Sequence, residues 1–310
     1  MLVADWGGTE YAWSSPVILG LAAVALAAWA LFFYSQSRVA EPIIPLRLFR
    51  SRIFNIATLI GMITVGVGMF AVVSYMPTYL QMVYGLSATV SGVMLLPLVL
   101  GLMGTSIASG RWMSRNGRYK LYPIIGSATV AVTFLLLSTL DAGSSEAVLC
   151  GYLFLLGLGL GLLIQTLVLA VQNAFPVSDV GTATSSNNFF REIGATLGIA
   201  TVGAIFTSRL ADQLASRLTS SDLRSIGGAD SLTPALVNSL PDHLHDAVVA
   251  AYQHALTPVF AYLVPVLLIG LVLAFVLPEK RIADHERNEG EHKAPDTHSA
   301  DRRPKVPTAD

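Results

Sequence analysis

Long apolar stretches alternate with short polar segments along most of the chain. Crossing a bilayer takes about 20 mainly apolar residues, and seven stretches qualify, approximately 17–34, 53–80, 88–109, 121–140, 147–172, 190–208 and 258–277. All but the sixth lack Asp, Glu, Lys and Arg. Because lipid offers backbone groups no hydrogen-bond partners, each stretch should be helical. The pattern predicts an all-α integral membrane protein with seven transmembrane helices.

The overall composition agrees with a chain that lies in lipid. Of its 310 residues 53% are hydrophobic and only 13% are charged, whereas a soluble domain has about 25% charged residues. The net charge of −1 gives no reason to expect a nucleic-acid partner. Its one cysteine excludes an intrachain disulfide. No metal site and no cofactor is expected.

Basic residues gather in every second loop. Segment 35–52, segment 110–120 and the tail from 279 hold all but four of the 19 basic residues, and the loops 81–87 and 141–146 hold none. By the positive-inside rule, the basic segments are cytoplasmic. The chain is therefore expected to cross the plasma (inner) membrane with its N-terminus outside and its C-terminus in the cytoplasm.

The segment "GRWMSRNGRYK" (110–120) resembles the short inner loop of the major facilitator superfamily, a pattern of Gly, three residues, Asp, Arg, any residue, Gly and Arg. The matching residues and their neighbours are Gly110, Ser114, Arg115, Gly117, Arg118 and Lys120. Ser114 stands where the pattern has Asp, which puts in doubt any gating ion pair made there. Gly117 permits a tight turn, and the arginines can hold the loop at anionic headgroups.

Three further stretches resemble the drug:proton antiporter family with fourteen spans. They are "WGGTEYAWSSP", "EPIIPLRLFRSRIF" and "GTATSSNNFFREIGATLGIATVGAIF". The resemblance implies only the C-terminal half of a multidrug efflux transporter, which exports hydrophobic or cationic small molecules by alternating access and proton antiport. It also implies that an N-terminal bundle is needed, whether this chain is a truncated gene product, has a misplaced start or is a split half.

This plan divides the chain into five parts. They are an outer loop (1–16), an extra central helix (17–34), a cytoplasmic linker (35–52), a six-helix C-terminal bundle (53–277) and a disordered cytoplasmic tail (278–310). Within the bundle, the outer loop 209–257 has a helical rhythm in "LADQLASRL" and "LHDAVVAAYQHAL". We expect amphipathic helix there, on the outer surface.

Two helical faces are candidates for a substrate pocket. On the second stretch, polar and methionine side chains recur at three- and four-residue steps, and on the fifth two glutamines are seven residues apart: Thr58, Met62, Met69, Met76, Gln165 and Gln172. Methionine surfaces adapt to varied shapes, and polar groups on apolar helices tend to face a cavity or another helix. Ordinary packing between helices explains the same pattern, so both interpretations stay open.

A titratable group within a span is the remaining candidate for function. Glu192, beside Arg191 at the inner mouth of the sixth stretch, is the only acid in the seven stretches. It could couple protons to transport, or the two charges could anchor the helix at the interface. The resemblance implies that the coupling acids lie largely in the N-terminal bundle.

Other functional classes fit less well. Seven spans with this orientation match receptors and retinal proteins, but all four lysines lie outside the spans, which excludes a retinal Schiff base. A non-retinal receptor would leave the inner-loop pattern unexplained. An enzyme is not expected, because HExxH, GxSxG and histidines within spans are all lacking. A seven-helix remnant or partner subunit without independent transport remains the alternative.

Overall fold

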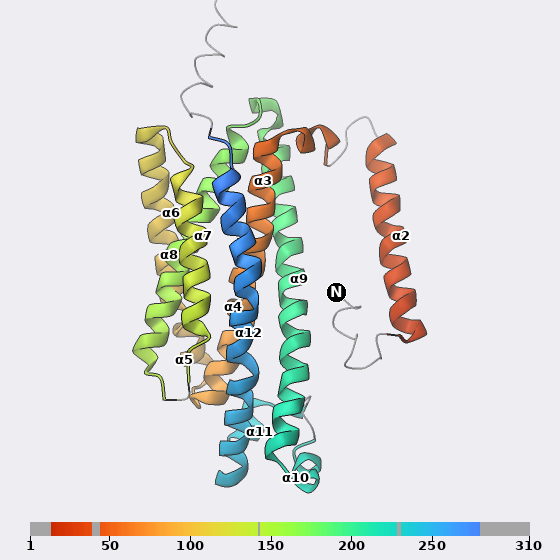
Figure 1. The fold of residues 1–310 in the computed structure, drawn as a ribbon, viewed down its shortest axis with the longest axis vertical. Coiled ribbons are helices and arrows are strands. Elements are labelled where there is room, and N and C mark those ends of the chain that lie inside the picture. Colours follow the sequence, from red (N-terminus) through yellow and green to blue (C-terminus); the bar gives the residue numbers. More distant parts are fainter. Residues whose placement is uncertain (1–13, 39–43, 142, 228–230, 280–310) are drawn as a thin grey trace, which may run out of the picture.

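The computed structural model describes residues 14–38, 44–141, 143–227 and 231–279, in which every regular element is a helix. They are α2 (Pro16–Arg38), the 3₁₀ helix η1 (Leu46–Arg50), α3 (Arg52–Ile60), the π-helix η2 (Gly61–Val67), α4 (Gly68–Val83), α5 (Ala88–Val93), α6 (Leu96–Asn116), α7 (Leu121–Leu137), α8 (Glu146–Gln172), α9 (Val177–Arg217), α10 (Ser220–Ser225), α11 (Pro234–Val237) and α12 (Asp242–Val276). Figure 1 shows α2 standing apart from a bundle of long helices. The all-α expectation is confirmed, while most of the predicted outer loop 1–16 and tail 278–310 falls outside the described residues.

Every predicted span has a helix at its position. Five helices are long and apolar enough to cross a membrane: Arg52–Val83 (α3, η2 and α4 in series), Ala88–Asn116, Glu146–Gln172, Val177–Arg217 and Asp242–Val276. Two shorter apolar helices, Pro16–Leu31 and Leu121–Leu137, lie at the first and fourth predicted spans. A multi-pass membrane protein follows, and crossing by the two shorter helices stays a prediction.

The last two long helices extend well beyond their predicted spans. The stretch 190–208 is the middle of the 41-residue α9, and 258–277 is the second half of the 35-residue α12. Much of the expected outer loop 209–257 is therefore helix that continues from the bundle, with α10 and α11 between (Figure 1). The reason is packing: Leu210, Leu214, Val248 and Ala251 are all buried, so the apolar stripes of these segments are covered by the protein.

Local sequence signals set several helix ends. Ser51, Ser87 and Ser145 precede α3, α5 and α8, and each side chain accepts a backbone N–H near the start of its helix. Such caps satisfy donors that have no partner within the helix. The predicted span 88–109 is divided into α5 and α6 just before Pro97, which lacks an N–H to continue the helix from α5.

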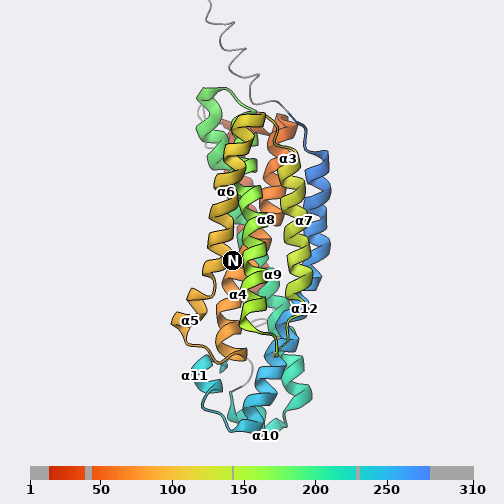
Figure 2. The same ribbon diagram turned by 90° about the vertical axis from the view of Figure 1, so that its left-hand side faces the viewer.

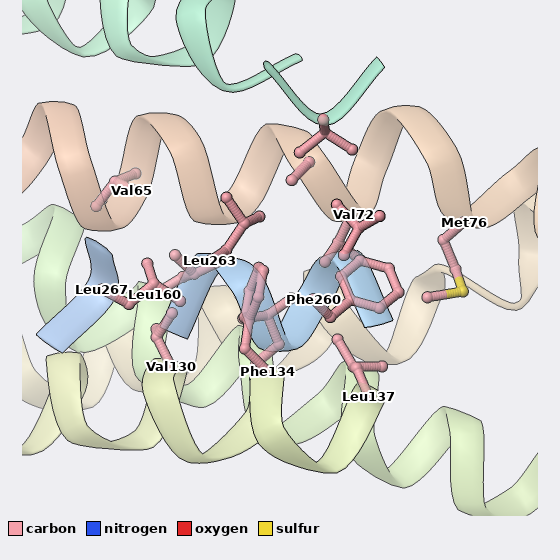
Figure 3. Packing of buried hydrophobic residues seen from close by; sticks show 14 of the residues in the cluster. Val65, Val72, Met76, Val130, Phe134, Leu137, Leu160, Phe260, Leu263 and Leu267 are labelled. Carbon is pink, nitrogen blue, oxygen red and sulfur yellow. The ribbon is translucent and has the colours of Figure 1, made fainter. Parts of the chain in front are cut away.

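The core lies between α4, α7, α8 and α12. Figure 3 shows side chains from these helices meeting there, including Val72, Phe134, Leu160 and Phe260. The Phe134 and Phe260 rings meet edge to face at 5.7 Å. Such aromatic pairs contribute about 0.5–1.5 kcal/mol beyond area burial. Many large apolar side chains on the outside of the helices are exposed, as expected for helices that face lipid.

Small residues permit two close helix contacts. A Cβ atom at Gly157 on α8 would collide with the carbonyl oxygen of Leu98 on α6, and one at Gly194 on α9 would collide with the carbonyl oxygen of Met62 in η2. The pairs α6–α8 and α9–η2 are among the most extensive in the fold. The two views in Figures 1 and 2 show α6 and α8 side by side. Close backbone packing through glycine is usual between membrane helices.

Candidate functional site

Only the last part of the predicted inner loop 110–120 is a loop: residues 110–116 are the end of α6, and 117–120 form a tight turn to α7. Gly117 ends α6 with φ +64°, a left-handed conformation that glycine adopts without steric cost, and its N–H donates to the Met113 carbonyl at 2.9 Å. The adjacent Tyr119 is fully buried, and its hydroxyl donates to the Pro278 carbonyl at 2.8 Å. The turn is thereby tied to the chain just after α12.

The polar side chains of this loop are open to solvent or lipid headgroups. Ser114 is exposed, and its hydroxyl donates to the Gly110 carbonyl at 2.9 Å within the same helix. A serine cannot form the ion pair that an acid would form there. Arg115 and Arg118 are exposed, and Lys120 is half-buried at the start of α7. Within the described residues, none of these three basic groups has an ion-pair partner.

A groove of about 520 Å³ adjoins this loop, between α6 and α8. It is lined by Ser106, Ile107, Gly110, Arg111, Ser114, Arg115 and Gln165. The Ser106 hydroxyl donates across the helix pair to the Gly161 carbonyl at 3.1 Å. A Cβ atom at Gly110 would lie only 3.6 Å from the Gln165 side chain. Gln165 was predicted to line a pocket, and the inner-loop residues were predicted as a separate motif. The structure places them together in one groove.

The methionines of the second span do not gather at this groove. Met62 lies in η2 against Gly194 of α9, whereas Met76 is fully buried in the core (Figure 3). Met69 is half-buried and packs against the core. The expected single face is interrupted because the π-helix η2 takes more residues per turn than an α-helix. Their role in a pocket stays a prediction, and packing between helices is what the geometry displays.

Thr58 has a polar partner that the sequence analysis missed. The Asn187 side-chain amide donates to the Thr58 hydroxyl at 3.0 Å, and both side chains are buried. Asn187 belongs to the polar run "TSSNN", which lies within α9 although the predicted span began only at residue 190. The run of polar residues directly before the predicted span was the available signal. The pair connects α3 to α9 at the end where the inner loop lies.

The other predicted residues lie at the edges of this region. Gln172 is half-buried and ends α8, two turns beyond Gln165. Arg191 and Glu192 are neighbours on α9 and make one contact at 3.5 Å, with side-chain exposures of 23% and 56%. Adjacent residues on a helix point in different directions, and such a long, exposed contact contributes little. Whether Glu192 couples protons or anchors the helix stays a prediction.

The segment before α3 is docked onto α9, a contact that the sequence did not reveal. Arg47 on η1 donates to Asp179 at 2.9 Å across 132 residues. The Phe49 ring lies edge to face with Phe54 at 5.6 Å and with Phe190 at 5.8 Å. Part of the predicted linker 35–52 is therefore ordered structure on the bundle.

The sequence matches a known family over most of its length. The family model described as Major Facilitator Superfamily matches residues 1–199. An uncharacterized MFS-type transporter of Mycobacterium tuberculosis is 40% identical over 284 residues, which are 92% of this chain and 41% of the relative. The multidrug transporter protein MdtP of Bacillus subtilis is 38% identical over 218 residues, 70% of this chain and 40% of the relative.

A tetracycline resistance determinant of Streptomyces rimosus is 32% identical over 219 residues, 69% of this chain and 62% of the relative. The chain spans about two fifths of the length of the first curated relatives that it matches. These matches agree with the expectation of a membrane transport protein and not an enzyme. The chain belongs to the Major Facilitator Superfamily.

Proposed function

We propose that this chain is the C-terminal bundle of a multidrug efflux transporter. The observation that carries the proposal is the kinship with relatives named as multidrug transporter, efflux pump and tetracycline resistance determinant. Its substrates would be hydrophobic or cationic small molecules, exported by alternating access. A second bundle, from the same or a separate chain, would complete the pocket.

We further propose that export is driven by proton antiport. In the described helices, Glu192 is the only acid inside a predicted span, and its side chain is more than half exposed. Acids that trade a proton against a cationic substrate need a desolvated site. The coupling acids would therefore belong to the second bundle, with the basic loop 110–120 at the cytoplasmic surface.

Gln165 is the residue through which the pocket can be tested. It lines the groove beside the inner loop, and its amide makes no hydrogen bond within the described part of the chain. It is thus available to a ligand. In a host lacking its own efflux pumps, the protein carrying Gln165→Leu should confer resistance to fewer compounds, or at least fourfold less resistance to some, because an amide that orients ligands is lost.

The matched control makes the same substitution elsewhere. Gln213 lies on α9 and does not line the groove, and its side-chain oxygen accepts hydrogen bonds from Arg217 of the same helix; the control is Gln213→Leu. Both variants should reach the wild-type level in membranes, measured by immunoblot. Unchanged resistance to every exported compound in Gln165→Leu would contradict the pocket assignment, and no resistance from the wild type would contradict efflux itself.

A further inference from the structure

A π-helix lies in the middle of the first long membrane helix. In the continuous helix Arg52–Val83, the residues Gly61–Val67 form η2, with α3 before it and α4 after it. A π-helix bonds each N–H to the carbonyl five residues back, and such stretches are rare and occur mostly as single turns at functional positions. Seven consecutive residues of π-helix within a membrane helix therefore need a physical reason.

Thr64 in η2 has a fully buried hydroxyl without a hydrogen-bond partner among the described residues. Buried threonines in the α-helices have one: Thr133, Thr166 and Thr257 each donate to the carbonyl four residues back, at 2.8, 2.6 and 2.9 Å. This bond is common for threonine in an α-helix. In a π-helix the carbonyl four residues back is displaced, because the turn is wider. The π-helix therefore leaves Thr64 with an unpaired donor, at a cost in free energy.

Two neighbouring helices pack tightly against η2. On one side, a Cβ atom at Gly270 of α12 would collide with the Thr64 hydroxyl. On the other side, a Cβ atom at Gly66 of η2 would lie 2.6 Å from the carbonyl oxygen of Arg191 on α9, closer than real side chains approach. The wide turn of the π-helix thus fits between α9 and α12 because glycine leaves room on both sides.

The two ends of η2 carry glycines that packing does not require. A Cβ atom at Gly61 would come no nearer than 3.7 Å to an atom of a packed neighbour, and one at Gly68 no nearer than 3.5 Å. Both are ordinary contact distances. Glycine gives the backbone more conformational freedom than any other residue. The two positions are therefore suited to a change in hydrogen-bond register between η2 and the α-helices that flank it.

We propose that η2 is a register switch, which converts between the π-helix of this structure and an α-helix. In the α-helical form, the Thr64 hydroxyl donates to the Ile60 carbonyl and moves away from Gly270. An α-helix turns by about 100° per residue and a π-helix by less, so conversion of the seven residues turns α4 relative to α3. The segment is then a two-state element. It does not depend on the export of any compound.

Each flanking helix is fixed to α9 by a hydrogen bond. The bond from Asn187 to Thr58 holds α3, and the Tyr75 hydroxyl on α4 donates to the Ile199 carbonyl at 3.1 Å. If Thr58 stays in place, turning α4 moves Tyr75 away from Ile199. The Tyr75 hydrogen bond therefore stabilises the π form, and the unpaired Thr64 hydroxyl destabilises it.

The distance between two spin labels on the flanking helices tests the proposal. Leu59 on α3 and Val73 on α4 are both exposed, so Leu59→Cys and Val73→Cys can each carry one label in the full chain with Cys150→Ser, which removes its one native cysteine. Pulsed electron paramagnetic resonance in lipid nanodiscs measures the distribution of distances. A continuous α-helix would separate the two positions by roughly 21 Å along its axis, and the π form gives a different distance. Pro77 lies beyond both labels, so a bend there does not contribute.

Two variants should shift the populations in opposite directions. Thr64→Val keeps the shape of the side chain but removes both the unpaired donor of the π form and the hydrogen bond of the α-helical form. It should lower the ratio of α-helical to π population at least about fivefold, the low end of the cost of an unpaired buried donor. Gly270→Ala places a Cβ atom against the Thr64 hydroxyl in the π form, and this overpacking should raise the ratio at least about fivefold.

The matched controls make the same substitutions in α-helices. Thr133→Val removes a buried hydroxyl from α7, and Gly104→Ala on α6 adds a Cβ atom that meets nothing within 4 Å. Both should leave the distribution of distances unchanged. If Gly270→Ala fails to fold, Tyr75→Phe takes its place, because it frees α4 from α9 and should also raise the α-helical population. One unchanged distance in the wild type and all these variants overturns the proposal, and so does an equal shift in Thr64→Val and Thr133→Val.

Discussion

The side-chain amide of Asn187 on α9 donates a 3.0 Å hydrogen bond to the hydroxyl of Thr58 on α3. Both side chains are less than one tenth exposed, so water is excluded from the pair. A buried polar group that loses its partner costs about 1–3 kcal/mol. The contact therefore holds α9 to α3 through two buried polar side chains.

Asn187→Ala should lower the free energy of unfolding by about 1–3 kcal/mol, because it leaves the Thr58 hydroxyl without its donor. Denaturation in detergent micelles measures the change. The adjacent Asn188→Ala, at a half-buried position, should have a smaller effect. Combining Asn187→Ala with Thr58→Val completes a double-mutant cycle, and strictly additive effects would show that the two side chains are not coupled.

Gly194→Ala should separate α9 from η2, because the new Cβ atom would collide with the Met62 carbonyl oxygen. Overpacking of this kind costs about 1–3 kcal/mol. Gly181→Ala on the same helix meets no atom within 4 Å and should be neutral or slightly stabilising, since alanine favours helix. The midpoint of thermal unfolding compares the two, and equal midpoints would contradict the close contact.

Phe49→Ala should loosen the docked η1 segment. Two edge-to-face ring contacts are lost, with Phe54 and Phe190, each contributing roughly 0.5–1.5 kcal/mol. Trypsin cleavage after Arg50 should then become several-fold faster, as followed by mass spectrometry. Asp179→Asn removes the ion pair with Arg47, whose side chain is 65% exposed, and should change cleavage little. The reverse order of effects would show that the ion pair holds the segment.

If the proposed proton antiport operates and Glu192 anchors α9 at the interface, Glu192→Gln should leave export within about twofold of wild type, since an exposed pair with Arg191 contributes little. The measurement is uptake of a fluorescent cationic substrate into inside-out vesicles, before and after collapse of the pH gradient. The wild type provides the control for coupling. Export by Glu192→Gln that no longer responds to the gradient would assign the coupling role to Glu192.

The length of the apolar stretches was enough to locate the helices along the chain. It did not predict where each helix ends or which side chains share a face. The stretches 190–208 and 258–277 mark only the most apolar parts of α9 and α12, because a helix continues wherever one face is buried, as at Leu214 and Val248. The segment Gly61–Val67 forms a π-helix. Its apolar composition does not distinguish a π-helix from an α-helix. The π-helix changes the angular spacing between Met62 and Met69, and the role of Met62, Met69 and Met76 in a pocket stays a prediction.

Single features of the site could be predicted from the sequence, but the contacts between helices that bring them together could not. The turn at Gly117 followed from glycine's tolerance of positive φ, and it is found there. The proximity of Gln165 to Gly110, the hydrogen bond from Asn187 to Thr58 and the ion pair from Arg47 to Asp179 depend on how helices pack across 55 to 132 residues. One sequence carries no direct record of those distances.

The length of α9 has a practical consequence for imaging. At 1.5 Å per residue its 41 residues extend about 60 Å, roughly twice the hydrocarbon thickness of a bilayer. With α10, α11 and the first half of α12, it forms a folded projection at one end of the bundle (Figure 2). Small membrane proteins are hard to align in electron micrographs when a detergent micelle surrounds them. A folded projection outside the micelle would reveal the orientation of each particle.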